Sequence, residues 1–162
     1  MLRLRDVLGR MQRGRLMRFF WRIHPRIYRA TRGLIGTRAG FGMPILLLDT
    51  VGRKSGEPRT NAVCYLRDGD RYFMIASNAG HGAHPAWLHN LRASPEATIQ
   101  VGRRRRPVRA REAQGEERER LWRKAVVVYP SYELYQRRAP QRRIPVVVLE
   151  PFTDRVGGGR RI

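Results

Sequence analysis

The stretch with the clearest chemistry is Asp49–Thr60, which reads DTVGRKSGEPRT. Apolar, strand-like runs flank it, so its two glycines and its proline predict a reversing turn between two strands. The turn carries Arg53, Lys54 and Ser55, and Arg59 follows closely. A guanidinium grips phosphate or carboxylate through two parallel hydrogen bonds, and an ammonium adds a point charge. These residue types predict either a solvated hairpin tip or a clamp for an anionic group.

Aromatic residues gather in two segments that together suit a flat ligand. Tyr129, Tyr132 and Tyr135 recur every three residues, and Tyr132 and Tyr135 share one face of a predicted helix. Trp87 lies in an earlier short helix. These rings either pack in the core or enclose a planar ring whose anionic tail runs to the cationic turn. The second arrangement indicates a flavin-like cofactor, which would carry the redox chemistry itself.

Three histidines and the single cysteine are the other candidates for chemistry. His81, His84 and His89 lie within nine residues of one another. Neither a neighbouring cysteine nor a second histidine pair completes a zinc site, so no metal site is expected. To act as a nucleophile, Cys64 would need a depressed pKa and a histidine partner. Its strand context favours a buried, inert thiol in the wall of a pocket.

Composition limits the class of protein. A chain of 162 residues suits one domain with a substantial core. The net charge of +21 predicts attraction to anions: nucleic acid, an anionic membrane surface or an acidic small molecule. One cysteine excludes an internal disulfide and suits a reducing compartment. No apolar run approaches the ~20 residues of a membrane-spanning helix, and no secretion signal is recognisable. We therefore expect a cytoplasmic protein.

The N-terminal segment is helical in pattern over residues 1–30. Five arginines fall on one face of this helix, opposite apolar and aromatic side chains: Arg15, Arg18, Arg22, Arg26 and Arg29. Such a helix either lies on an anionic bilayer, at the inner face of the plasma membrane, or packs on the domain. The chain is accordingly divided into a basic helix and linker (1–35), a folded domain (36–152) and a flexible basic tail (153–162).

Strand-like runs dominate the middle of the chain. Apolar patterning predicts about six strands, near residues 43–50, 60–67, 71–77, 96–102, 106–113 and 144–150. Helices are predicted between Pro85 and Pro95, from Gly115 to Pro130, and in the following SYELYQRR. The run Arg103–Arg106 is predicted at the tip of a turn. Hairpin-linked strands with a few helices indicate an α+β, barrel-like roll of mostly antiparallel strands.

Seven motifs resemble one known family in order and spacing. They are TVGRKSGEPR, LRDGDRY, ASNAG, HPAWLHNLRASPEATIQV, EERERLW, YPSYELYQRR and IPVVVLEP, and they cover residues ~43–151. The chain resembles the deazaflavin-dependent nitroreductase family of actinobacteria. The resemblance implies a split β-barrel, similar to that of FMN-binding oxidases. It also implies the cofactor coenzyme F420, a deazaflavin with a phosphate and an acidic oligoglutamyl tail.

The resemblance implies specific roles for residues of this chain. The family's phosphate-holding turn corresponds to Arg53, Lys54, Ser55 and Arg59. The segment beside the deazaflavin ring corresponds to Thr60, Asn61, Ala62, Val63 and Cys64. The next strand end at the ring corresponds to Ala76, Ser77 and Asn78, and the short helix lining the site to Ala86, Trp87 and Asn90. The tyrosines that shape the substrate pocket correspond to Tyr129, Tyr132 and Tyr135, with Tyr132 nearest the cofactor.

Two departures from the family pattern bear on the acceptor. Nitroimidazole-activating members carry a tyrosine at the position of Cys64 and a lysine at the position of Asn78. The resemblance therefore implies hydride transfer to a quinone of the menaquinone type, ahead of nitroaromatics. In this hypothesis Tyr132 stabilises developing negative charge on the acceptor or donates a proton.

Three alternatives remain open from the sequence. An FMN-dependent oxidoreductase would use the same fold. A nucleic-acid-binding module would use Arg103–Arg106 and the arginine face of the N-terminal helix, but its aromatic residues are not interleaved with those arginines. The third alternative is a cofactor-binding protein without enzyme activity.

Overall fold

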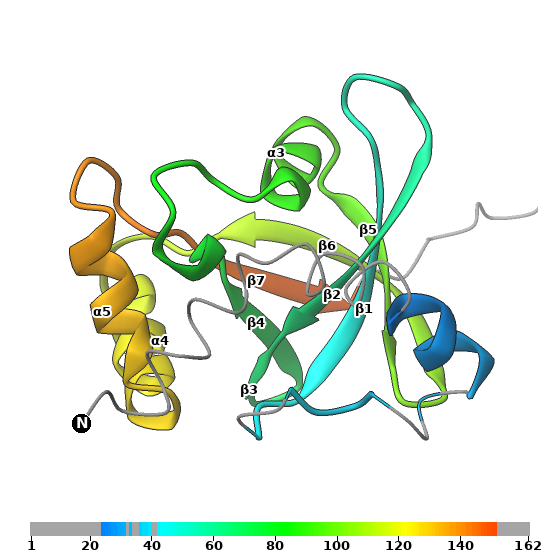
Figure 1. The fold of residues 1–162 in the computed structure, drawn as a ribbon, viewed down its shortest axis with the longest axis horizontal. Helices are drawn as coiled ribbons and strands as arrows, with labels where there is room; N and C mark the ends of the chain where they lie inside the picture. Colours follow the sequence, from blue (N-terminus) through cyan, green and yellow to red (C-terminus); the bar gives the residue numbers. More distant parts are fainter. Residues whose placement is uncertain (1–23, 32, 34–35, 40–41, 152–162) are drawn as a thin grey trace, which may run out of the picture.

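The computed structural model of this chain describes residues 24–31, 33, 36–39 and 42–151. Its centre is a seven-stranded sheet in which every pair of neighbouring strands is antiparallel (Figure 1). The strands are β1 (Ile45–Val51), β2 (Pro58–Cys64), β3 (Leu66–Asp68), β4 (Arg71–Ile75), β5 (Glu96–Val101), β6 (Arg104–Glu112) and β7 (Val146–Pro151). The helical elements are η1 (Asn78–Gly80), α3 (Ala86–Ala93), α4 (Gly115–Val128), α5 (Ser131–Arg138) and a helix over residues 24–30.

The sheet curls until its two edge strands meet. The strand order is β2-β1-β5-β6-β7-β4-β3, which puts β2 and β3 at opposite edges. In the chain, only Tyr65 separates the end of β2 from the start of β3. A single residue spans no more than about 4 Å, so the two edges must approach each other. This closure confirms the split β-barrel expected from the sequence.

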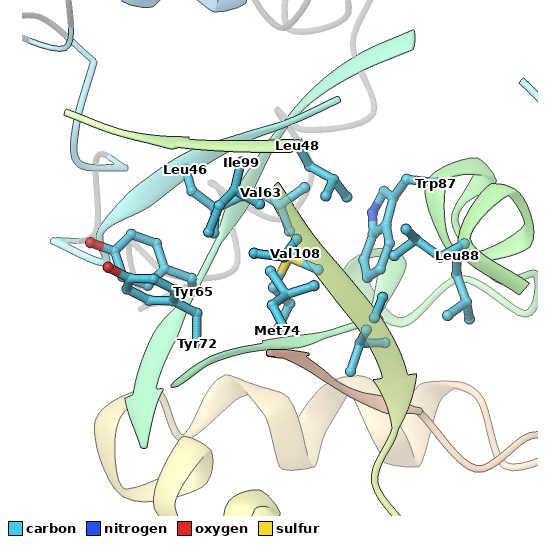
Figure 2. Close-up of a cluster of buried hydrophobic side chains, with 14 of the residues drawn as sticks. Leu46, Leu48, Val63, Tyr65, Tyr72, Met74, Trp87, Leu88, Ile99 and Val108 are labelled. Atoms are coloured by element: carbon cyan, nitrogen blue, oxygen red, sulfur yellow. The ribbon is translucent and has the colours of Figure 1, made fainter. Parts of the chain in front are cut away.

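The inside of the barrel is filled by every second residue of the strands, because successive side chains point to opposite faces. Figure 2 shows this cluster, with Trp87 and Leu88 of α3 at one end and Tyr65 and Tyr72 at the other. The two tyrosine rings meet edge to face at 5.3 Å. Between them lie aliphatic side chains from several strands: Leu46, Leu48, Val63, Met74, Ile99 and Val108.

Strands β4 and β7 are covered on both faces, which explains their continuous apolar sequences. Phe73 and Val148 point out of the barrel and meet Leu121 and Ala125 of α4. Helices α4 and α5 lie side by side against this outer face (Figure 1). The second hydrophobic cluster therefore fixes these two helices to the barrel, and with them the tyrosines of the SYELYQRR segment.

The helix over residues 24–30 packs on the outer face of β1. Tyr28 is fully buried against Ile45 and Leu47. Its hydroxyl donates to the carbonyl of Ile45 (3.2 Å) and accepts from the amide of Gly102 (2.8 Å). Of the two alternatives for the N-terminal segment, packing on the domain is therefore right for this part. Residues 1–23, which carry most of the arginine face, lie outside the described residues.

The expected strand 60–67 is two strands in the structure. Strand β2 ends at Cys64, the chain crosses from one sheet edge to the other at Tyr65, and β3 begins at Leu66. The segment reads as one continuous strand-like run, so the sequence carries no local mark of the crossing. The barrel therefore has seven strands, where the sequence predicted about six.

The sequence predicted that the Arg103–Arg106 run lies at the tip of a turn. This prediction is wrong for most of the run, because strand β6 includes Arg104 to Arg106. The turn consists of Gly102, with a φ of 59°, and Arg103, and strand β6 already begins at Arg104. Arg105 forms an ion pair with Asp49 across the sheet at 3.0 Å. A two-residue hairpin turn needs a residue with positive φ, which glycine accepts without strain. The position of Gly102 therefore determines which arginines of β6 lie opposite which residues of β5.

Candidate functional site

A cavity of about 470 Å³ opens between the edge strand β2, the segment that connects β4 to α3, and helices α4 and α5. Its lining residues are Asn61, Ala62, Val63, Cys64, Ile75, Ser77, Asn78, Ala79, His81, His84, Pro85, Ala86, Trp87, Tyr129, Tyr132 and Tyr135. Ligand pockets for small molecules and cofactors commonly have volumes of ~300–1,000 Å³. The cavity is therefore large enough for a fused-ring ligand.

The first wall is the edge strand β2, from Asn61 to Cys64. Burial raises the pKa of the Cys64 thiol to about 12. At neutral pH this group is a protonated thiol, whereas a nucleophile would have to be a thiolate. Cys64 is half-buried in the cavity wall, and its raised pKa is consistent with the unreactive thiol expected from the sequence.

The second wall is the connection from β4 to α3, and its backbone is unusual. Asn78 and Ala79 have φ values of 49° and 54°, a left-handed conformation that costs energy for residues other than glycine. The side chain of Asn78 donates to the carbonyl of Ala83 (3.0 Å), which closes the segment on itself. Gly80 packs against the backbone of Tyr135, where a Cβ atom would lie 3.1 Å from the Cα. The wall is therefore held in a single conformation.

Arg142 stabilises this second wall through hydrogen bonds to its backbone. Its guanidinium donates to the carbonyls of Ala76 (3.3 Å), Ser77 (2.7 Å) and His81 (2.9 Å), and it lies 3.1 Å from Nδ1 of His84. Few other side chains present enough donors in a rigid fork to serve four acceptors. Arg142 was not predicted from the sequence, because nothing distinguishes it from the neighbouring arginines of the RRAPQRR segment.

The third wall consists of three tyrosines that pack on one another. The Tyr129 and Tyr132 rings meet edge to face at 5.1 Å, and the hydroxyls of Tyr129 and Tyr135 are 3.2 Å apart. The Tyr132 hydroxyl donates to the sulfur of Met43 (3.7 Å). Desolvation raises the pKa of Tyr132 well above its ordinary value, and burial likewise raises the pKa of Tyr135. Both are neutral phenols that can donate hydrogen bonds.

The cationic turn does not line the cavity but lies beside it, between β1 and β2. Arg53, Lys54, Ser55 and Arg59 are exposed. The Ser55 hydroxyl accepts hydrogen bonds from the amide of Glu57 and from Arg59, both at 3.3 Å, so it shapes the turn. The register of β1 and β2 confirms the predicted hairpin.

Asn90 connects this turn to the cavity. The side chain is buried on α3, accepts from the amide of Arg53 (3.2 Å) and donates to the hydroxyl of Thr50 (3.1 Å). Trp87 lies three residues earlier on the same helix, which is about 4.5 Å along the axis, and it lines the cavity. One short helix therefore fixes both the aromatic wall and the cationic turn.

Many of the residues predicted from the resemblance come together around the cavity: Asn61, Ala62, Val63, Cys64, Ser77, Asn78, Ala86, Trp87, Tyr129, Tyr132 and Tyr135. Thr60 lies outside it and donates to Asp49 (2.5 Å). Ala76 is fully buried in the barrel core. The prediction missed Ile75, Ala79, His81, His84 and Pro85 as lining residues, although the histidine cluster was visible in the sequence as a possible metal site.

The three histidines do not gather around one point. In the described part of the chain, no group of three or more His, Cys, Asp or Glu side chains is arranged to hold a metal ion. His84 and His89 approach each other with ring centroids 5.8 Å apart, while His81 contacts Arg142 through its backbone carbonyl. His84 instead belongs to the cavity wall.

Comparison with known proteins agrees with this geometry. The family model described as F420H(2)-dependent quinone reductase matches residues 20–151. The F420H(2)-dependent quinone reductase Rv1261c of Mycobacterium tuberculosis (strain ATCC 25618 / H37Rv) is 43% identical over 134 residues, which are 79% of this chain and 87% of that protein.

Two solved structures are similar over most of their own length. An F420-H2 dependent reductase (FDR-A) is 41% identical with a TM-score of 0.61, covering 66% of this chain and 94% of that one. A domain-swapped dimer is 35% identical with a TM-score of 0.63, covering 79% of this chain and 96% of its own. The fold, the cavity and these matches together show that the chain belongs to the F420H(2)-dependent quinone reductase family of oxidoreductases.

Proposed function

We propose that this protein uses coenzyme F420 to reduce a quinone in the cavity between β2, α3 and the three tyrosines. The observation that carries the proposal is the position of that cavity. Helix α3 links it to an exposed cationic turn: Trp87 lines the cavity, and Asn90 of the same helix accepts from the amide of Arg53. A ligand with a flat ring and an anionic tail fits this pair of sites, and the relatives' names supply the identity of the cofactor and the acceptor class.

The cavity residues suit the ring of a deazaflavin. Trp87 and the tyrosines offer aromatic surface, and Ala62 and Val63 of β2 add small apolar side chains to the lining. Asn61 and Ser77 add polar groups to the lining. Coenzyme F420, when bound in its reduced form, supplies a hydride. FMN, the runner-up from the sequence, shares the need for a flat site but has no support in the relatives' names.

The turn suits the phosphate and acidic tail. Many arginines elsewhere in the molecule are paired with carboxylates. Among the described residues, no ion pair involves Arg53, Lys54 or Arg59, so their charges are available to an external anion. Charge-assisted hydrogen bonds to such an anion are roughly twice as strong as neutral ones.

A tyrosine at the cavity assists the acceptor. An acceptor that gains a hydride develops negative charge, and a fixed donor at that atom lowers the barrier. Tyr132 remains our candidate, because its hydroxyl is protonated and, among the described residues, its hydrogen-bond partner is a thioether sulfur, a weak acceptor that a stronger one can replace. The other walls exclude water and hold the reactants close together.

A quinone is the acceptor class named for the relatives, and menaquinone and nitroaromatics are narrower hypotheses. The test is anaerobic oxidation of reduced coenzyme F420 by the purified protein with a menaquinone analogue, a short-chain quinone and a nitroaromatic in parallel. We expect turnover that depends on quinone and saturates. Cofactor binding without turnover of any acceptor would contradict the proposal and favour a binding protein without enzyme activity.

Association with an anionic membrane surface stays a prediction. It depends on residues 1–30, of which the structure describes only the last seven, as a helix packed on β1. No helix in the described ranges is both long and apolar enough to cross a membrane. The division of the chain at residues 35/36 and 152/153, the cytoplasmic location and the expectation that nucleic acid is not a partner are predictions as well.

A further inference from the structure

Resting on the proposed function, we propose that His84 is a hydrogen-bond donor for a carbonyl oxygen of the ring bound in the cavity, with Arg142 as the residue that fixes its tautomer. Neither residue was assigned a role by the sequence or by the comparisons. Both the deazaflavin and a quinone carry ring carbonyls that can accept this hydrogen bond. The experiments below determine which of the two ligands supplies the carbonyl.

The contact with Arg142 fixes which nitrogen carries the proton. The guanidinium Nη1 lies 3.1 Å from Nδ1 of His84. An arginine side chain has donors but no acceptor, so Nδ1 must accept, and it cannot itself carry a hydrogen. The proton of the neutral ring is therefore on Nε2, as a donor.

The imidazole of His84 belongs to the wall of the cavity. His84 is half-buried and lines the cavity, while its Nδ1 atom contacts the guanidinium of Arg142. No hydrogen bond of the described residues engages Nε2, the second ring nitrogen, and the proposal requires this atom to face the cavity. A fixed N–H at the wall of a cavity, without a protein acceptor, is suited to an oxygen of a ligand.

The surroundings keep this imidazole neutral. Desolvation by burial is the main cause that lowers the pKa of His84, and the positive charges of Arg142 and Arg92 lower it further. Glu112 acts in the opposite direction but does not reverse the shift. A neutral imidazole polarises a carbonyl without requiring a change of protonation state at neutral pH.

Arg142 is a positioning residue in this arrangement. The guanidinium that donates to Nδ1 of His84 also donates to the carbonyls of Ala76, Ser77 and His81. The orientation of His84 is therefore tied to the backbone of the cavity wall, which gives the donor a fixed place before any ligand arrives.

The first measurement is on the ligand-free protein. The imidazole ¹⁵N chemical shifts of His84 report its tautomer directly, and we expect an unprotonated Nδ1 and a protonated Nε2 at neutral pH. Arg142→Lys should convert His84 to a mixture of tautomers. A protonated Nδ1 in the unchanged protein would overturn the proposal, whatever the cofactor or acceptor proves to be.

The second measurement separates the cofactor from the acceptor. Glutamine places an amide N–H close to the position of Nε2, and asparagine places one close to Nδ1, so His84→Gln should retain function and His84→Asn should not. His84→Phe should lower either the affinity for oxidised coenzyme F420 or kcat/KM for the quinone at saturating cofactor, on the order of 10- to 100-fold. His89→Phe, a change to the adjacent ring outside the cavity lining, is the control.

Each outcome has one meaning. If His84→Phe weakens binding of the cofactor and leaves kcat/KM unchanged, the carbonyl oxygen belongs to the deazaflavin. If it lowers kcat/KM for the quinone and leaves the Kd for the cofactor unchanged, the carbonyl oxygen belongs to the acceptor. If both quantities stay within twofold of the unchanged protein in His84→Phe, the proposal is wrong. If the unchanged protein neither binds the cofactor nor reduces a quinone, the proposed function fails, and the tautomer measurement still decides the role of Arg142.

Discussion

Lys54 is the residue on which the anion clamp depends most simply, because it is one of only two lysines in the chain. The other, Lys124, lies 3.5 Å from Asp68 and has no contact with the turn. We expect Lys54→Ala to weaken binding of coenzyme F420 about tenfold, which corresponds to about 1.4 kcal/mol for one exposed charge-assisted contact. Fluorescence titration at low and high salt measures this loss, which should shrink with salt.

The matched control for this change is Lys124→Ala, which removes the same charge from α4 and should leave the affinity unchanged. Equal effects of the two substitutions would mean that only the net charge of the molecule attracts the cofactor. That result would contradict a specific site at the turn.

Tyr132 is expected to act on the acceptor and not on the cofactor. Tyr132→Phe removes the hydroxyl but keeps the ring that packs on Tyr129, so the cavity should retain its shape. We expect kcat for the quinone to fall on the order of 10-fold, while the Kd for coenzyme F420 stays the same. Tyr72→Phe, which removes a hydroxyl inside the barrel away from the cavity, should leave both quantities unchanged.

The raised pKa of Tyr132 makes a pH prediction at the same residue. Desolvation holds its pKa well above the ordinary tyrosine value of about 10, so the hydroxyl remains protonated throughout the neutral and mildly alkaline range. The ratio of kcat between the unchanged protein and Tyr132→Phe should therefore be constant from about pH 7 to pH 9. A ratio that falls as the pH rises through this range would show that the phenol titrates there.

At the scale of elements, α3 has the task of joining the turn to the cavity. Asn90→Ala removes both the acceptor of the Arg53 amide and the donor to Thr50. We expect a loss of about 1–3 kcal/mol in the free energy of unfolding, because buried polar partners are left unsatisfied. The affinity for coenzyme F420 should also fall several-fold, although Asn90 does not line the cavity.

Hydrogen exchange distinguishes the cause of that weaker binding. The amides of residues 52–57 should exchange faster in Asn90→Ala, because the turn has lost its anchor on α3. His89→Ala, at the preceding position of the same helix, should leave their exchange unchanged. Unchanged exchange in Asn90→Ala would show that the turn is held by its own hydrogen bonds.

Asp68 is one of the carboxylates that join the hairpin of β3 and β4 to α4. Asp68 lies 3.0 Å from Arg71, 2.7 Å from Arg120 and 3.5 Å from Lys124. Hydrogen bonding from Arg120 is the main cause that lowers the pKa of Asp68 far below its ordinary value. A carboxyl with a lowered folded-state pKa contributes stability above its unfolded pKa and loses it as the pH falls through the folded value.

Asp68→Asn should therefore lower the free energy of unfolding by about 1–3 kcal/mol at neutral pH. The difference from the unchanged protein should be constant down to about pH 4 and shrink only in stronger acid. Urea unfolding at a series of pH values measures it, with Asp70→Asn, at an exposed position of the same hairpin, as the control. A difference that is the same at every pH would exclude the charge of Asp68 as its cause.

The elements themselves were largely predictable from local sequence. Apolar runs marked the strands, because alternate residues fill the barrel and β4 and β7 are covered on both faces. Prolines marked the limits of α3 and the end of α4. The crossing at Tyr65 was not predictable, because it depends on which strands become the edges of the sheet, and that is decided by pairings distant in the chain.

The part of the candidate site that lies within the recognised sequence motifs was predictable. Residues of β2, of α3 and of the tyrosine segment that the resemblance implied line one cavity, and their roles toward a cofactor or acceptor stay predictions. The resemblance missed Arg142 and the place of His84, because their contact joins residues 58 positions apart and rests on the conformation of an irregular loop. Neither an arginine among many arginines nor a histidine beside a proline carries a local signal for such a contact.

For the whole molecule, the central claim is that a deazaflavin with an acidic tail binds the cavity and the turn together. The net charge of +21 alone would attract any anion, so affinity by itself is a weak criterion. A matched comparison of two flat cofactors is stronger, because FMN has a phosphate and a similar ring but lacks the acidic tail.

The most direct measurement is therefore a fluorescence titration of oxidised coenzyme F420 with the purified protein, with FMN in parallel at the same ionic strength. We predict saturable binding of coenzyme F420, clearly tighter than that of FMN, and weakened by Lys54→Ala but not by Lys124→Ala. Binding of FMN in preference to coenzyme F420, or binding of neither, would contradict the account.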